Sequence, residues 1–236
     1  MARNDSRTLF IIPARGGSKG LPGKNTKLLD GKPLLHYSID YARLFADDKD
    51  ILVSTDDTAI AACAAAAGLE IPFMRPEKLA ADDSGMSEVL LHAVNMFADN
   101  NDIYERIVLL QPTSPARKRE HLEGALSLYR TDLDMIVSVC ESKANPYFNL
   151  YEEDEDGFLA ISKNAGIDSR QKAKPVYLFN GSIYIINAAS LISYKTLSHF
   201  RKVRKFIMAK EYSVDIDDAT DWLFAEAVMR TYFNPA

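Results

Sequence analysis

Short apolar runs alternate with helical patterns through the first 140 residues of this chain, and no other feature restricts its fold as strongly. Runs of strand length cover Thr8–Ile12, Asp50–Ser54, Arg106–Leu110 and Met135–Val139. Helical patterns cover Leu34–Ala46, Thr58–Ala67, Ser87–Ala98 and Arg119–Tyr129. Strand–helix–strand units of this kind build a parallel sheet with helices on its faces. We therefore expect an α/β fold with a Rossmann-like, mainly parallel sheet.

The alternation then stops. Residues 141–175 have the pattern of short extended pieces around the acidic turn Glu152–Gly157, which we interpret as a solvated hairpin tip and not as a metal site. Strands resume at Ser182–Asn187 and Arg204–Met208, and a last helix covers Ala219–Tyr232. We assign residues 1–140 and 200–236 to a catalytic α/β domain and 141–199 to an inserted lobe. The lobe has few apolar residues for a core of its own, so we expect it to lean on a second subunit.

The composition excludes several classes of protein. Of 236 residues, 47% are hydrophobic and 26% are charged, which suits one sizeable core with a small appended lobe and not a disordered chain. A net charge of −5 gives no basic surface for nucleic acid. The cysteines Cys63 and Cys140 indicate buried thiols in a reducing compartment. The polar start has no apolar segment of signal-peptide or membrane-spanning length behind it, so we expect a cytoplasmic protein with no membrane partner.

A loop rich in glycine and cations follows the first strand. The segment Pro13–Asn25 contains four glycines, which let the backbone approach an anion, and Arg15, Lys19 and Lys24, which supply positive charge. It has neither the glycine and lysine spacing of a P-loop nor a dinucleotide fingerprint. Taken alone, it is also compatible with a glycine turn whose lysines are solvated. Its place directly after an apolar strand favours a triphosphate site, and so nucleotidyl or phosphoryl transfer.

Three aspartates in the segment Asp215–Asp218 form the second candidate site. Side chains alternate along an extended segment, so Asp215 and Asp217 point to the same side. Paired carboxylates beside a triphosphate suit Mg²⁺, which binds carboxylate and phosphate oxygens. For Asp218 we prefer a different role, as the cap of the last helix.

Polar residues at other strand ends complete the pattern. In a parallel sheet the loop at Arg15, Ser54–Asp57 and Gln111–Pro115 fall at one edge, where ligands gather. The Gln111 amide can donate to and accept from a polyhydroxylated sugar, and the Arg170 guanidinium can grip a carboxylate. Alone, either is equally compatible with a loop or surface role. The four histidines show no metal spacing, and no nucleophilic serine or cysteine elbow occurs.

Together, these segments resemble those of a known family. The resemblance rests on Pro13–Gly20 with Lys24 and Asn25, Val53–Asp56, Arg75 and Pro76 with Leu79 and Ala80, Leu110–Pro115, Arg170 and Gln171, Asn180–Tyr184, and Ser213–Asp217. In this order they are similar to the motifs of the acylneuraminate cytidylyltransferases, the CMP-sialic acid synthetases, over nearly the whole chain. The resemblance implies a nucleotide-diphospho-sugar transferase fold. It also implies Mg²⁺-dependent transfer of CMP from CTP to the anomeric hydroxyl of a nine-carbon 2-keto sugar acid, with release of pyrophosphate.

The same resemblance assigns roles to individual residues. For nucleotide binding it implies Ala14, Arg15, Gly16, Ser18, Lys19, Lys24, Asn25, Arg75 and Ser84. For catalysis it implies Arg15 and Lys19, which would neutralise the triphosphate, with Asp215 and Asp217 as Mg²⁺ ligands. For the sugar acid it implies Gln111, Gln171 and Asn180, with Arg170 facing the carboxylate. It further implies a homodimer in which the lobe of one subunit closes the sugar pocket of the other.

Two alternatives stay open at this point. One is another sugar nucleotidyltransferase of the same fold, such as an eight-carbon (KDO) cytidylyltransferase. The other is a non-catalytic nucleotide-sugar binding protein, which we disfavour because Lys19, Gln111 and the aspartate pair are all present. Met86 stands where similar proteins often have a hydroxyl residue, and the sialic, legionaminic, pseudaminic and deaminated sugar acids all remain candidate acceptors.

Overall fold

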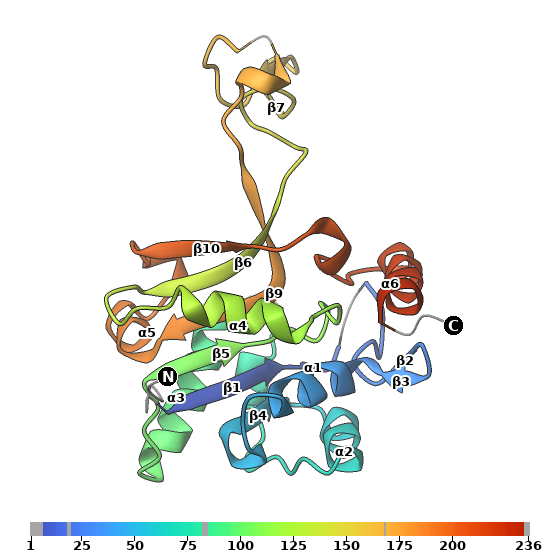
Figure 1. Ribbon diagram of the computed structural model, residues 1–236, viewed down its shortest axis with the longest axis vertical. Coiled ribbons are helices and arrows are strands. Elements are labelled where there is room, and N and C mark those ends of the chain that lie inside the picture. Colours follow the sequence, from blue (N-terminus) through green and yellow to red (C-terminus); the bar gives the residue numbers. More distant parts are fainter. Residues whose placement is uncertain (1–6, 18–19, 82–84, 168, 234–236) are drawn as a thin grey trace.

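A six-stranded sheet with helices on both faces forms the centre of the molecule, and a long ribbon projects from it (Figure 1). The structure is a computed structural model that describes residues 7–17, 20–81, 85–167 and 169–233. The strand order is β10-β6-β9-β5-β1-β4, and β9 alone among these six runs antiparallel to its neighbours. The expected α/β architecture with a mainly parallel sheet is confirmed.

The elements follow the sequence patterns closely. The sheet strands are β1 Thr8–Pro13, β4 Ile51–Ser54, β5 Arg106–Leu109, β6 Met135–Glu141, β9 Tyr177–Asn187 and β10 Val203–Ile207. The helices are α1 Leu34–Arg43, α2 Thr58–Ala66, α3 Met86–Asp99, α4 Arg119–Ser127, α5 Ala188–Tyr194 and α6 Ala219–Tyr232. Two small antiparallel pairs are β2 Leu28–Leu29 with β3 Lys32–Pro33, and β7 Tyr151–Glu153 with β8 Leu159–Ile161. No helix in these described segments is long and apolar enough to cross a membrane.

Strand β1 shows why the apolar runs are continuous and not alternating. Leu9 and Ile11 belong to a cluster with residues of α3 and α5, whereas Phe10 and Ile12 belong to a cluster with residues of α1, α2 and α4. Both faces of the strand are therefore buried, as in sheets covered by helices on both sides. Each such side chain contributes about 1.5–3 kcal/mol through burial.

The projecting ribbon is the elaborated loop of a hairpin. Strand β6 ends where Glu141 pairs with Tyr177, the first residue of β9, and the chain between them leaves the sheet (Figure 1). The acidic turn is exposed between β7 and β8, as predicted. The lobe was predicted over 141–199, but only residues 142–176 project from the sheet. Residues 177–199 form β9, which belongs to the sheet, and α5, which covers it. The physical reason is the apolar stretch Ile183–Ile186 of β9, most of which is buried between β5 and β6.

A buried carboxylate holds the far end of this hairpin. Asp134, directly before β6, accepts hydrogen bonds from the Arg201 and Lys202 backbone N–H groups at 2.9 and 2.8 Å and from the Ser190 hydroxyl at 2.7 Å. Burial raises the pKa of Asp134, but these hydrogen bonds outweigh it and leave the pKa below its usual value. The ionised carboxylate thus links α5 and the entry to β10 with β6.

We predict that Asp134→Asn destabilises the protein by about 1–3 kcal/mol at pH 7, because an amide cannot accept all three hydrogen bonds. Since the pKa of Asp134 is lowered by folding, its contribution is complete above the unfolded value of 3.8 and is lost as the pH falls through the lower folded value. Urea unfolding at pH 7 and at decreasing pH checks this. Asp132→Asn, an exposed change two residues away, serves as the control and should leave the midpoint unchanged. An equal loss for Asp134→Asn below pH 3 would contradict the ionic role.

Candidate active site

A cavity of about 470 Å³ opens at the carboxyl ends of β1 and β5. Its lining comes from four separate segments of the chain, which supply Pro13, Arg15, Gly20, Lys24 and Asn25; Arg75, Leu79, Ala81, Met86 and Val89; Gln111, Pro112 and Thr113; and Asp217. The glycine-rich loop, the Gln111 loop and the aspartate segment therefore share one edge of the sheet, where parallel strands gather ligands.

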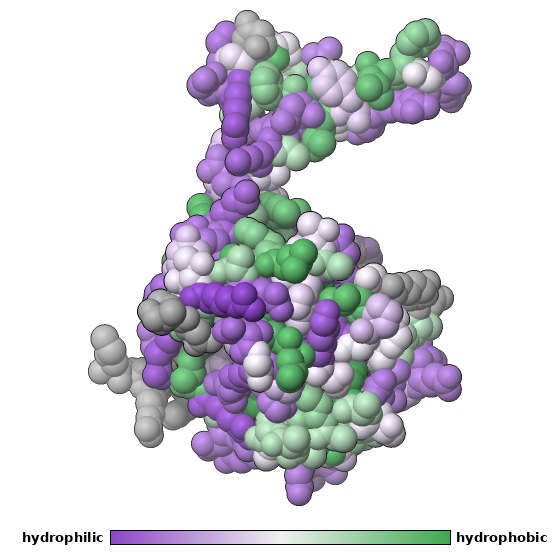
Figure 2. Space-filling model, turned by 90° about the vertical axis from the view of Figure 1, so that its right-hand side faces the viewer, coloured by the Kyte–Doolittle hydropathy of each residue, from purple (hydrophilic) through white to green (hydrophobic). Residues whose placement is uncertain are grey.

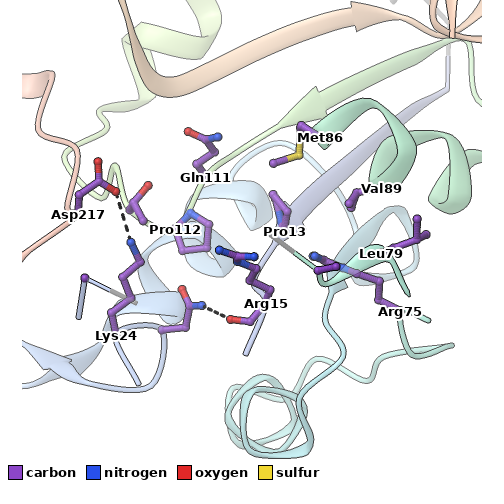
Figure 3. Close-up of a pocket in the computed structure, with 14 residues that line it drawn as sticks. Pro13, Arg15, Lys24, Arg75, Leu79, Met86, Val89, Gln111, Pro112 and Asp217 are labelled. Carbon is purple, nitrogen blue, oxygen red and sulfur yellow. Dashed lines mark hydrogen bonds and ion pairs between the residues drawn. The ribbon is translucent and has the colours of Figure 1, made fainter. Parts of the chain in front are cut away.

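Two cations of the first loop are fixed at this cavity. The Arg15 guanidinium donates to the Ala80 carbonyl at 3.2 Å. The Lys24 ammonium donates to the Ile216 carbonyl at 2.8 Å and lies 3.6 Å from an Asp217 carboxylate oxygen. Figure 3 shows Arg15 between this Lys24–Asp217 pair on one side and apolar side chains on the other. Positive charge is thus held at the carboxyl end of β1, where an anionic ligand would bind.

Asn25 supports the loop from beneath. It is 5% exposed, and its amide donates to the Arg15 carbonyl at 3.2 Å. Ser18, Lys19 and Ser84, which the family resemblance assigns to nucleotide binding, lie outside the described residues.

The glycines at the start of the loop approach protein groups. The Ala14 N–H donates to the Ser54 carbonyl at 2.9 Å, and the Gly16 N–H donates to an Asp56 carboxylate oxygen at 3.1 Å. A Cβ on Gly16 would lie 2.8 Å from Asp57 Oδ2, so a larger residue here would require the Asp57 side chain to shift. In this structure the N–H groups of Ala14 and Gly16 therefore donate to protein oxygens, and their nucleotide-binding role stays a prediction.

The aspartate segment shows the predicted alternation. Val214 and Ile216 are buried against α6, while Asp215 and Asp217 are exposed on the opposite side. Partial dehydration by surrounding groups raises the pKa of Asp215; a hydrogen bond from Thr113 opposes this rise, and the charge of Asp217 adds to it. Two carboxylates that repel each other in this way favour a bound cation.

Asp218 caps the last helix, as predicted. Its carboxylate accepts from the Thr220 and Asp221 backbone N–H groups at 2.7 and 3.0 Å, and the Asp221 side chain accepts in return from the Asp218 N–H. The reciprocal pairing fixes the point at which the aspartate segment ends and α6 begins.

Three side-chain oxygens converge on Gly181, which has φ of +69°. A Cβ at this position would lie 2.6 Å from Gln111 Oε1, 2.8 Å from Ser114 Oγ and 3.2 Å from Asp215 Oδ2. Within the described part of the chain, the Gln111 amide has no hydrogen-bond partner, and it lines the cavity. This corner can therefore donate to and accept from hydroxyl groups of a ligand.

Asn180 lies behind the cavity wall and does not line it. It is 2% exposed; its amide oxygen accepts from the Ser138 hydroxyl at 2.6 Å, and its nitrogen donates to the Ser213 hydroxyl at 2.9 Å. Direct sugar contact by Asn180 is therefore corrected to a supporting role, because protein partners already use both ends of its amide. Arg170 and Gln171 form a 3₁₀ turn in the projecting ribbon, away from the cavity of their own chain (Figure 1).

The remaining wall is mostly apolar. Leu79, Met86 and Val89 face the cavity beside Arg75 (Figure 3). Arg75 is nearly buried, donates from Nε to the Ser54 hydroxyl at 3.1 Å and also contacts the Ser54 carbonyl; burial lowers its pKa. Val89 lines the cavity but was not among the residues predicted from the sequence. The spacing of three residues between Met86 and Val89 at the start of a helix is the signal that could have revealed a shared face.

The comparisons with known proteins agree with this geometry. A family model described as cytidylyltransferase matches residues 9–229. The chain belongs to this family. The cytidylyltransferase is 33% identical to the CMP-N,N'-diacetyllegionaminic acid synthase of Legionella pneumophila, over 94% of this chain and 96% of that protein. It is 36% identical to an N-acylneuraminate cytidylyltransferase of Streptococcus agalactiae, over 92% of this chain but 52% of that longer protein.

A solved structure supports the fold independently. The CMP:2-keto-3-deoxy-manno-octonic acid synthetase complexed with CTP superposes with a TM-score of 0.71 at 20% identity, covering 96% of this chain and 99% of that one. At this identity the similarity concerns the fold. The predicted family membership is confirmed, and the protein is a nucleotidyltransferase and not a non-catalytic binding protein.

We predict that Gly181→Ala lowers kcat/KM for nucleotidyl transfer by about 10²-fold, because the new methyl group displaces the Gln111 amide and Asp215. Gly157→Ala is the matched control, since Gly157 also has a positive φ, +84°, but no atom lies within 4 Å of an added Cβ. Steady-state rates and thermal unfolding of both variants separate crowding from backbone strain. Equal activity losses in the two variants would contradict the assignment of Gln111 and Asp215, the residues around Gly181, to the active site.

Proposed function

We propose that this cytidylyltransferase transfers CMP from CTP to the anomeric 2-hydroxyl of a nine-carbon 2-keto sugar acid and releases pyrophosphate. The observation that carries the proposal is the corner at Gly181, where the Gln111 amide, without a hydrogen-bond partner among the described residues, lies beside Asp215 in a cavity that Arg15 and Lys24 also line. The acceptor class is supported by the names of the two relatives, which act on diacetyllegionaminic acid and N-acylneuraminate.

The cavity divides into three chemical zones that match the parts of the two substrates. Arg15 and Lys24, with Lys19 as the predicted third cation, would hold the triphosphate and offset charge on the departing pyrophosphate. The apolar wall with Leu79 and Met86 suits the flat face of a base. Gln111 would orient the sugar acid so that its hydroxyl lies in line with the α-phosphorus, which turns the reaction into an effectively intramolecular step.

Asp215 and Asp217 would hold Mg²⁺. Their donor set fits: two exposed carboxylates repel each other, and one of them borders the phosphate-binding cations. In the described residues, no group of three or more histidine, cysteine or acidic side chains is arranged to bind a metal, so phosphate oxygens and water would complete the coordination. When bound, the ion would neutralise charge on the triphosphate. Lys24, which lies 3.6 Å from an Asp217 carboxylate oxygen, would compete with the ion for this carboxylate.

We further propose a homodimer in which Arg170 acts on the partner's site. Apolar side chains are exposed on the ribbon and at its base, namely Leu150, Tyr151, Phe158, Leu159, Leu178 and Phe179. Figure 2 shows that the ribbon stands clear of the body, with apolar groups spread over it. A second subunit that covers these groups would also explain why Arg170, expected near the sugar carboxylate, lies away from the cavity of its own chain.

The proposed reaction is tested by pyrophosphate release from CTP, UTP, ATP and GTP with Mg²⁺ against a panel of eight- and nine-carbon 2-keto sugar acids. We expect release with CTP and at least one nine-carbon acid, and none after addition of EDTA. Release with only an eight-carbon acid would replace the proposed acceptor class by the KDO alternative. Release that depends on no sugar acid would contradict the reaction.

The dimer proposal predicts complementation between two inactive variants. Gln111→Ala and Arg170→Ala chains are co-expressed with different tags, and the heterodimer is purified through both tags. If Arg170 acts across the interface, one of the two sites regains both residues, and the heterodimer shows about half of the wild-type activity. Homodimers of each variant, purified in the same way, are the controls. Heterodimer activity no higher than the mean of these controls would place Arg170 in its own chain's site or outside both.

A further inference from the structure

A buried arginine lies directly behind the Gln111 corner. Arg117, in the connection from β5 to α4, is 5% exposed. Its guanidinium donates to the Gln111 carbonyl at 2.5 Å, to the Ser182 carbonyl at 2.9 Å and to the Ser38 hydroxyl of α1 at 3.1 Å. A single planar group therefore links the loop after β5, strand β9 and helix α1.

This cation has an unusual environment. All three acceptors are neutral, and among the described residues no carboxylate lies within ion-pair distance of it. Burial lowers the pKa of Arg117 to about 10, which leaves it charged at neutral pH, while Tyr41 and the more distant carboxylate of Asp215 oppose this fall. The Tyr41 ring lies 5.7 Å from the guanidinium carbon. Burying a charge without a carboxylate partner is costly. An apolar side chain would be sufficient if the residue only filled space. We therefore infer that an arginine is present here for the hydrogen bonds that its guanidinium N–H groups donate.

The strand register shows what the donors do. Strands β5 and β9 pair antiparallel down to Leu109 opposite Tyr184, and the pairing then ends. Continued for two more residues, the same register would place Gln111 opposite Ser182, and these are the two residues whose carbonyls Arg117 binds. The guanidinium thus bridges the strands at the point where they separate to form the corner of the cavity.

We propose that Arg117 is a positioning residue for the acceptor side of the site. By fixing both strands where they separate, it sets the position of the Gln111 amide relative to Gly181 without touching either substrate. The identity of the acceptor rests on the proposed function. The hydrogen bonds from Arg117 to Gln111 and Ser182 do not depend on it. Lysine cannot replace the group, because an ammonium lacks the planar fork that reaches acceptors on three elements.

The test uses Arg117→Lys in the full chain, which keeps the charge and removes the bridge. We expect kcat/KM for the sugar acid to fall at least about 10-fold, while the Kd of CTP, measured by calorimetry, changes by less than about twofold. Arg106→Lys is the matched control, because Arg106 lies at the other end of β5, binds the Thr8 hydroxyl at 2.9 Å and stacks on Tyr129. An unchanged kcat/KM for the acceptor, a parallel loss of CTP affinity, or the same loss in Arg106→Lys would each overturn the proposal.

A second readout does not depend on activity. Hydrogen exchange should accelerate in Arg117→Lys at residues 111–114 and 181–183 and stay unchanged at 20–25. If the wild-type protein uses no acceptor of the panel, the proposed function fails, but hydrogen exchange still tests the bridge between β5 and β9. Unchanged exchange at residues 111–114 and at 181–183 would overturn the proposal for Arg117.

If Arg117→Lys does not fold, Ser38→Ala removes one acceptor of the guanidinium and is expected to lower kcat/KM for the sugar acid severalfold. No change in Ser38→Ala would then overturn the proposal.

Discussion

The buried amide of Asn180 holds together the parts on which the site depends. It accepts from Ser138 on β6, where the strand register shifts, and donates to Ser213 in the segment that leads to Asp215. The Ser138 hydroxyl in turn accepts from the Ile183 N–H at 2.7 Å. A buried polar group that loses its partner costs about 1–3 kcal/mol, so each of these bonds is strongly favoured. The left-handed turn at Gly181 and the approach of Asp215 follow from this network.

Charge is arranged differently on the two sides of the cavity. On the side that we propose for the nucleotide, Lys24 and Arg15 donate to carbonyl oxygens and line the cavity. On the side that we propose for the acceptor, the charge of Arg117 is buried and directed at backbone carbonyls, while the neutral Gln111 amide lines the cavity. The first arrangement suits a polyanion, and the second suits hydroxyl groups that need defined hydrogen-bond geometry.

The sequence predicts the framework of the fold well and the inner details of the site poorly. Continuous apolar runs such as Leu9–Ile12 predict buried strands because both faces of β1 are covered, and α6 has the predicted bounds Ala219–Tyr232. An apolar run carries no direction, however, so the antiparallel course of β9 was not predictable. It follows from the ribbon, which returns the chain beside β6 without a crossover helix.

The same limit applies to individual polar residues. A strand-end asparagine and an arginine after Ser114-Pro115 have the pattern of ligand-binding or surface residues. Asn180 and Arg117 are instead buried, because their partners Ser213, Ser38 and Ser182 come from distant parts of the chain. Gln111 was predictable as a cavity residue, since its position at the end of β5 depends only on local sequence and on the direction of the strand. The aspartate pair lies beyond a 3₁₀ turn that follows β10, and only its alternation with buried Val214 and Ile216 was predictable.

The hairpin origin of the ribbon has a consequence for how such enzymes diverge. Residues 142–176 connect two strands that are already paired to each other, so the sheet fixes only the two ends of this segment. Its length and sequence can change without altering the register of β6 and β9 or the loop that follows β1, which leaves the same edge of the sheet from a different strand. The ribbon can therefore diverge by replacement of one contiguous stretch of chain, while the segments that line the cavity, all of which lie outside it, are kept.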